Sequence, residues 1–117
     1  MKKFQFAREE SAIVKLQKNL GVDNASFMTL MYELERESAQ NTNASEPDSN
    51  ALTIGQYNIF RYMYFNEVRI SDIVKIYSCS EDVIRDIEER AINRLNALKG
   101  ILSISVYVPG LGVRVRG

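Results

Sequence analysis

Hydrophobic and polar residues alternate with helical spacing near the start of the chain. In residues 7–20, Ile13, Leu16 and Leu20 fall on one stripe of a helix. Gly21 follows this stripe and is a natural C-terminal stop, because glycine readily takes the left-handed conformation that ends many helices. The pattern therefore predicts a first helix that ends at Gly21.

A second helical face follows in residues 22–40. Its apolar positions are spaced i, i+3, i+4 and i+7, and they are Phe27, Leu30, Met31 and Leu34. Asp23 or Asn24 can cap the start of this helix. Residues 1–39 are thus expected to form an N-terminal helical hairpin.

Residues 40–51 break the pattern, since they are crowded with Asn, Ser, Asp and Pro and have little apolar content. Such a composition is typical of a linker or mobile loop. The helical pattern returns at Thr53, a candidate cap, with Ile59, Phe60 and Met63 as the expected inward set. This aromatic-rich segment opens a unit that spans residues 52–100.

Two further helices are predicted in that unit, joined by a turn at residues 78–80. Ser71 is expected to cap the short first helix, with Ile73, Val74 and Ile76 buried. Ser80 is expected to cap the second, which runs to about Lys99 and closes at Gly100. The second helix has the strongest stripe in the chain, formed by Ile84, Ile87, Ala91, Leu95 and Leu98.

The last segment, residues 101–117, changes to a period of two. Valine and isoleucine alternate with polar residues on both sides of a "PGLG" turn, which predicts a β-hairpin with Arg114 and Arg116 on its polar face. A lone hairpin is marginal in water, so its valine face is expected to pack on the helices or on another chain. The expected fold is mostly α, a helical bundle with a C-terminal helix-turn-helix followed by a β-hairpin.

Composition narrows the function. The chain has 117 residues, 45% of them hydrophobic, with one cysteine, Cys79, and no histidine. A disulfide framework and Cys/His zinc sites are excluded, and no phosphate loop or catalytic constellation is visible, so we expect neither an enzyme nor a cofactor or metal. No apolar run is long enough to span a membrane, and a cytoplasmic location is expected.

Charge is balanced overall but uneven along the chain. Formal net charge is zero. Residues 1–20 are rich in Lys and Arg, and residues 21–52 are rich in acids. A neutral total is unusual for a protein that binds nucleic acid by electrostatics alone, so local patches matter more than the sum.

The predicted pair of helices has the spacing of a helix-turn-helix. Val74 takes the position where the helices cross, Ser78 the turn, and Cys79 a small buried position before Ser80. The outward face of the second helix then carries mixed charges, which are Glu81, Asp82, Arg85, Asp86, Glu89 and Arg90, with Asn93 and Arg94 further along.

Residues 52–99 resemble the fourth region of bacterial sigma factors, and similar units occur in small phage and mobile-element regulators. The likeness lies in "SDIVKIYSCSEDVIRDIEERAINRLNAL", where "IRDIE" and the following "AI..L" are similar to the family's "IR.IE..AL..L". The resemblance implies that the second helix reads promoter DNA. Glu81 and Asp82 depart from the family, which usually has a basic residue after the cap.

The candidate DNA contacts follow from these positions. Arg85 is the best candidate for a bidentate contact to guanine. Arg61, Arg69 and Lys75 can meet phosphates around the motif, as can Arg90 and Arg94. Arg114 and Arg116 are a candidate wing. The acids Glu81, Asp82, Asp86 and Glu89 belong to the same face, where an acid can accept a hydrogen bond from cytosine.

Structural alternatives exist for several of these residues. Arg85 can simply pair with Glu81, Asp82 or Glu89 at helical spacing. Glu88 is expected to hold the motif together by bonding to the preceding helix. The hairpin arginines can serve only as a solubilising face, and Cys79 is expected in the core, because no histidine exists to activate it.

Two functions remain in view. The first is a DNA-binding transcription regulator, acting on double-stranded DNA as a homodimer that spaces its second helices about one helical turn apart. The alternative is a protein-interaction module, a phage or mobile-element modulator that docks on RNA polymerase or another protein through its acidic face.

Overall fold

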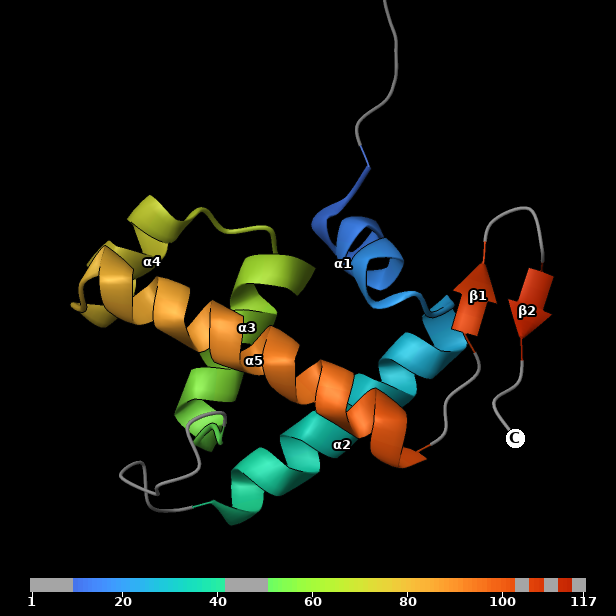
Figure 1. The fold of residues 1–117 in the computed structure, drawn as a ribbon. Coiled ribbons are helices and arrows are strands. Elements are labelled where there is room, and N and C mark those ends of the chain that lie inside the picture. The colour runs from blue at the N-terminus through green and yellow to red at the C-terminus, as the bar shows by residue number, and fades with distance from the viewer. Residues whose placement is uncertain (1–9, 42–50, 103–105, 109–111, 115–117) are drawn as a thin grey trace, which may run out of the picture.

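The computed structural model describes residues 10–41, 51–102, 106–108 and 112–114. The compact part of the chain is an all-α bundle of five helices (Figure 1). They are α1 (Ala12–Leu20), α2 (Asn24–Gln40), α3 (Ile54–Phe65), α4 (Ile70–Tyr77) and α5 (Glu81–Leu102).

Local signals set both ends of α1. The Ser11 hydroxyl accepts a hydrogen bond from the backbone N–H of Val14, so α1 begins at Ala12. The first residues of the predicted helix, 7–9, lie outside the described residues. Gly21 ends the helix in the left-handed conformation, with φ of 74°. The predicted stop at Gly21 is confirmed. Glycine suits this position because a residue with a Cβ atom would be strained in the left-handed conformation.

The starts of α2 and α3 are also capped as predicted. The Asp23 carboxylate accepts a hydrogen bond from the backbone N–H of Ser26, which holds the pKa of Asp23 below its usual value. Thr53 and Gln56 exchange side-chain and backbone hydrogen bonds in a capping box at the start of α3. Each cap satisfies N–H groups that a helix start leaves without partners.

The ends of α4 and α5 differ from the prediction. Ser71 does not cap α4, because the helix begins at Ile70 and Ser71 lies inside it. Arg69 stands at the cap position without a side-chain cap bond. Ile70 packs against the core, which draws it into the helix. Gly100 does not close α5, since the helix continues to Leu102 and Gly100 keeps a helical backbone.

Ile76 is the second correction in α4. The sequence predicts it buried with Ile73 and Val74, but Ile76 is 56% exposed, while Ile73 is fully buried. The bundle packs against the side of this short helix that carries Ile70, Ile73 and Val74, and Ile76 is turned away from that contact. The end of α4 therefore presents an isoleucine to solvent.

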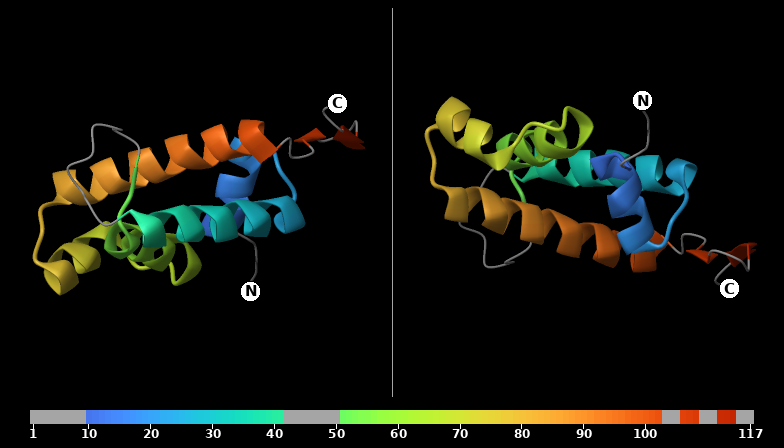
Figure 2. Two further views of the ribbon diagram at one scale, coloured as in Figure 1. Left: turned by 90° about the horizontal axis from the view of Figure 1, so that it is seen from below. Right: turned by 90° about the horizontal axis from the view of Figure 1, so that it is seen from above.

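All five helices contribute side chains to one core. The two longest helices, α2 and α5, pack against each other, and α3 packs on both (Figure 2). Helix α1 packs on α3, and α4 packs on the first part of α5. The predicted inward residues of α2 and α5 are all buried, from Phe27 in α2 to Leu98 in α5. The segments on either side of residues 42–50 thus fold into a shared bundle, and those residues lie outside the described part.

Two three-residue strands follow the helices. β1 (Val106–Val108) and β2 (Gly112–Arg114) pair antiparallel, with Val106 opposite Arg114. The predicted turn, the side chains of these strands and all of Arg116 lie outside the described residues. The expected packing of the valine face and the candidate wing therefore stay predictions. Within the described ranges, no helix is both long and apolar enough to cross a membrane.

Candidate interaction surface

The connection between α4 and α5 is a tight turn at residues 78–80. Ser78 takes the left-handed conformation, with φ of 55° and ψ of 44°, which glycine adopts more readily than a residue with a Cβ atom. The hydroxyl of Ser80 accepts a hydrogen bond from the backbone N–H of Val83 at 3.3 Å, so the predicted cap of α5 is confirmed. Ile84 is fully buried, and Cys79 is half-buried against the core. The Ser80 cap and the buried Ile84 thus specify this turn. The left-handed conformation of Ser78 is sterically unfavourable, because its Cβ atom lies close to the following carbonyl oxygen.

The start of α5 carries an exposed acidic face. Glu81, Asp82, Arg85, Asp86 and Glu89 are all exposed, as the helical pattern predicts. Four of these five side chains are carboxylates. Glu81 and Asp82 suit the first turn, where the helix dipole favours negative charge.

Arg85 is paired with an acid of its own helix. Its Nη2 and Nε atoms lie 2.6 and 2.8 Å from Oε2 of Glu81, one turn away. Both side chains are more than half exposed. Exposed pairs of this kind stabilise a helix by about 0.3–0.5 kcal/mol, so a partner molecule can replace this pair at little cost.

Arg90 and Arg94 are held by the protein itself. Arg90 binds Oδ2 of Asp86 at 2.9 Å and the backbone oxygen of Ala51 at 2.7 Å, and its side chain is only 19% exposed. Arg94 makes two hydrogen bonds to the Glu37 carboxylate of α2, at 2.6 and 3.0 Å, and is 26% exposed. These two arginines fasten α5 to the rest of the bundle, a role that the sequence pattern did not predict.

The other candidate basic residues lie on α3 and α4. Arg69 is highly exposed and stands 3.7 Å from Asp72, and Lys75 is exposed on the same short helix. The Arg61 guanidinium lies over the ring of Phe65, 4.8 Å from its centroid. Among the described residues, the candidate basic DNA contacts that are exposed are thus Arg61, Arg69, Lys75 and Arg85.

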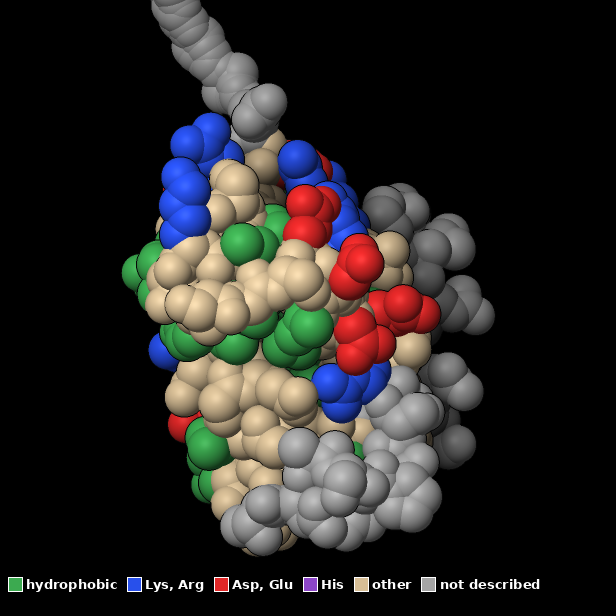
Figure 3. Space-filling model, turned by 90° about the vertical axis from the view of Figure 1, so that its left-hand side faces the viewer, with side chains coloured by type: hydrophobic (Ala, Val, Ile, Leu, Met, Phe, Trp, Pro, Cys, Tyr) green, Lys and Arg blue, Asp and Glu red, His purple; other side chains and the backbone are tan. Residues whose placement is uncertain are grey.

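Exposed hydrophobic side chains flank the turn. Besides Ile76, Tyr77 is 43% exposed and Val83 is 47% exposed. We name this end of the molecule the turn surface, made of Ile76, Tyr77, Glu81, Asp82, Val83, Arg85, Asp86 and Glu89. Figure 3 looks onto this end and shows hydrophobic side chains across its middle, with a row of acidic side chains along one edge.

The sequence pattern predicts the exposure of only some of these hydrophobic side chains. Val83 lies off the buried stripe of α5, which the pattern already gives, so its exposure follows from helical spacing. Ile76 and Tyr77 fall at the end of a two-turn helix, where burial depends on what packs beside it. Only the tertiary structure decides that their outer sides stay open.

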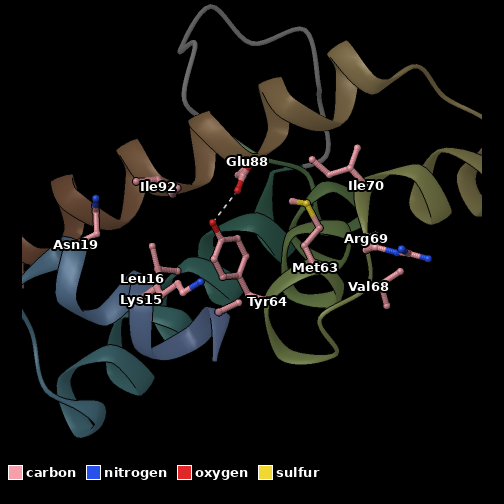
Figure 4. Close-up of a pocket in the computed structure, with 11 residues that line it drawn as sticks. Lys15, Leu16, Asn19, Met63, Tyr64, Val68, Arg69, Ile70, Glu88 and Ile92 are labelled. Carbon is pink, nitrogen blue, oxygen red and sulfur yellow. Dashed lines mark hydrogen bonds between the residues drawn. The ribbon is translucent and has the colours of Figure 1, made fainter. Parts of the chain in front are cut away.

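Glu88 joins two helices. Its Oε2 atom accepts a hydrogen bond of 2.7 Å from the hydroxyl of Tyr64 in α3 (Figure 4). Burial, together with this bond to a carboxylate, raises the pKa of Tyr64 well above its usual value. The predicted bond of Glu88 to the preceding helix is wrong, because its partner lies on α3 and not on α4.

Two further features of the described part of the chain concern metal-ligating and thiol groups. No group of three or more His, Cys, Asp or Glu residues in those ranges is arranged to hold a metal ion. Cys79 is a free thiol packed beside the core.

No protein family, no curated protein and no solved structure matches this chain. The resemblance to the fourth region of sigma factors accordingly stays a prediction from sequence. Function has to be argued from the residues of the turn surface, since a fold alone does not specify a function.

Proposed function

We propose that this protein is an interaction module that docks on another protein through the turn surface. The observation that carries the proposal is the make-up of that surface. Exposed Ile76, Tyr77 and Val83 stand beside four carboxylates, while Arg90 and Arg94 are held by the bundle.

The charges argue against a DNA groove as the first target. A helix that enters the major groove brings its first turns close to phosphates on both strands. At the start of α5 those turns present four exposed carboxylates and one exposed arginine, Arg85. Two of the four carboxylates are ion-paired, Glu81 with Arg85 and Asp86 with Arg90. Neutralisation of phosphates by Lys and Arg supplies most of the affinity of DNA-binding proteins.

The same composition suits a protein partner. Protein interfaces have an apolar centre, often with a tyrosine, and a polar rim whose charges complement the partner. Ile76, Tyr77 and Val83 supply the centre, and the carboxylates of α5 supply an acidic rim. The partner is therefore expected to present a basic surface with an apolar centre. RNA polymerase is the first partner to test, because the resemblance to sigma factors points to it.

The test compares two aspartate substitutions at exposed hydrophobic positions. Ile76→Asp changes the turn surface, and Tyr32→Asp changes an exposed residue of α2. Binding to purified bacterial RNA polymerase, and capture of proteins from a bacterial lysate, are measured for both variants. Ile76→Asp is expected to weaken binding at least tenfold, and Tyr32→Asp to leave it unchanged. If neither measurement separates Ile76→Asp from the wild type, the proposal is wrong.

A second candidate function is DNA binding by the same pair of helices. It is favoured by two further exposed cations, Arg69 at the cap position of α4 and Lys75 within α4. Its test is a fluorescence titration with random and genomic duplexes at two salt concentrations. Tight, salt-sensitive binding that Arg85→Ala weakens would favour this function over docking on a protein, and would be consistent with a homodimeric regulator.

A further inference from the structure

A cavity of about 440 Å³ opens between α1, the connection from α3 to α4, and α5 (Figure 4). It lies outside the turn surface. Its volume falls in the range of about 300–1,000 Å³ that is typical of small-molecule sites. Its walls come from three separate parts of the chain, so a ligand inside it would contact three elements of the fold at once.

The two sides of this cavity differ in polarity. Lys15 and Asn19 line it from α1, and Met63, Val68 and Ile70 line it from the opposite side, where α3 leads into α4 (Figure 4). Leu16 and Ile92 add further apolar wall beside the α1 side. An elongated ligand can therefore place a polar end against α1 and an apolar body against the start of α4.

The charges at the cavity favour an anionic polar end. The Glu88 carboxylate accepts the hydrogen bond of the Tyr64 hydroxyl (Figure 4), and the Glu67 carboxylate accepts one from the backbone N–H of Ala12 at the edge of the cavity. Arg69 also lines the cavity, but its side chain extends into solvent. Lys15 is exposed, and among the described residues no ion pair satisfies its ammonium group. A ligand carboxylate beside Lys15 gains a charged partner, and repulsion by Glu88 keeps that carboxylate on the α1 side.

From this arrangement we infer that the cavity binds a small monocarboxylic acid with an unbranched apolar body. Lys15 receives the carboxylate, and Met63, Val68 and Ile70 contact the body. The inference is independent of the proposed docking function, because it requires no residue of the turn surface.

The experiment uses sodium octanoate and the whole chain labelled with [¹³C]methyl-methionine. Met63 lines the cavity, and Met28 is exposed on α2, outside the lining. Octanoate is expected to shift the Met63 methyl signal saturably and to leave the Met28 signal in place. No shift of Met63, or equal shifts of both signals, would overturn the inference, since the second result indicates detergent-like coating of the surface.

A pair of lysine variants tests the assigned charge. Lys15→Met removes the cation at the cavity, and Lys18→Met removes a neighbouring cation of α1 that pairs with Glu10 and does not line the cavity. Lys15→Met is expected to weaken octanoate about tenfold, as for loss of one hydrogen bond to a charged group. Octan-1-ol, which has no charge, is expected to bind both variants alike. If Lys15→Met binds octanoate as the wild type does, the carboxylate assignment is wrong.

Discussion

The two parts of α5 make an instructive comparison. In residues 81–89 every charged side chain except that of Glu88 is exposed, and Arg85 pairs only with Glu81 of its own helix. From Arg90 onward the basic side chains reach across the bundle. Arg94 binds Glu37, and the Lys99 ammonium donates a hydrogen bond to the backbone oxygen of Leu20 at 2.6 Å.

The difference arises from what lies beside each part. The first part of α5 packs on α4, a helix of eight residues that covers one side of it. The second part packs on α2, whose seventeen residues bring Glu37 beside Arg94. Arginines on one helix thus differ in how freely they can bind a partner molecule. The sequence pattern alone overestimates how many of them are free to do so.

The largest expected effect separates the two parts by packing. Leu95→Ala removes a fully buried side chain next to α2 and is expected to lower the free energy of unfolding by about 2–5 kcal/mol. Val83→Ala, at the exposed start of α5, is expected to change it by less than about 0.5 kcal/mol. Urea unfolding followed by circular dichroism measures both. Similar losses for the two variants would mean that the start of α5 is buried in solution.

The next comparison removes one arginine from each part. Arg94→Met leaves the half-buried Glu37 carboxylate without its two hydrogen bonds, and is expected to cost about 1–3 kcal/mol of unfolding free energy. Arg85→Met breaks only an exposed pair and is expected to cost less than about 0.5 kcal/mol. Equal losses of unfolding free energy in thermal denaturation would contradict the distinction between the arginine of residues 81–89 and the arginines from Arg90 onward.

Tyr64→Phe tests the bond at the boundary between the two parts. Loss of its hydrogen bond to Glu88 is expected to cost about 1 kcal/mol near neutral pH. The raised pKa of Tyr64 means that the folded chain keeps this proton while the unfolded chain loses it near pH 10, so the stability from this group falls as pH rises above about 10. The deficit of Tyr64→Phe relative to the wild type should therefore shrink in that range. A constant deficit up to pH 11 would show that the hydroxyl ionises normally.

The smallest expected effect concerns the turn before α5. Ser78→Gly relieves the left-handed strain at φ of 55° and is expected to raise the unfolding free energy by about 0.5–1 kcal/mol. Ser78→Ala keeps a Cβ atom in the same conformation and should give no such gain. A rise of the melting temperature in both variants would point to the hydroxyl, and not to the backbone, as the source of strain.

Much of the fold could be predicted from local patterns. The stripe from Ile84 to Leu98 and the caps at Asp23 and Thr53 depend on spacing and on hydrogen bonds within one turn, and all are confirmed. Ser71 and Gly100 failed as boundary signals because neighbouring residues were drawn into the helices. Short-range preferences of this size are easily outweighed by packing.

The candidate surface was harder to predict. Helical spacing gave the outward positions of Glu81, Asp82 and Arg85 correctly. It also assigned Arg90 and Arg94 to the same open face, because the sequence does not reveal which acids of distant segments lie opposite. Because Arg90 and Arg94 bind other parts of the bundle, fewer cations are available to phosphates on this face. This favours the proposed protein partner over a DNA groove.

The amino-acid sequence by itself determined where the helices lie and which stripe of each turns inward, since helical period and end caps act over a few residues. Tertiary structure alone decided that Glu37 meets Arg94, that Tyr64 meets Glu88, and that Ile76 is left in solvent. Those outcomes depend on the directions in which whole helices cross, and a crossing direction is set by the packing of the complete core.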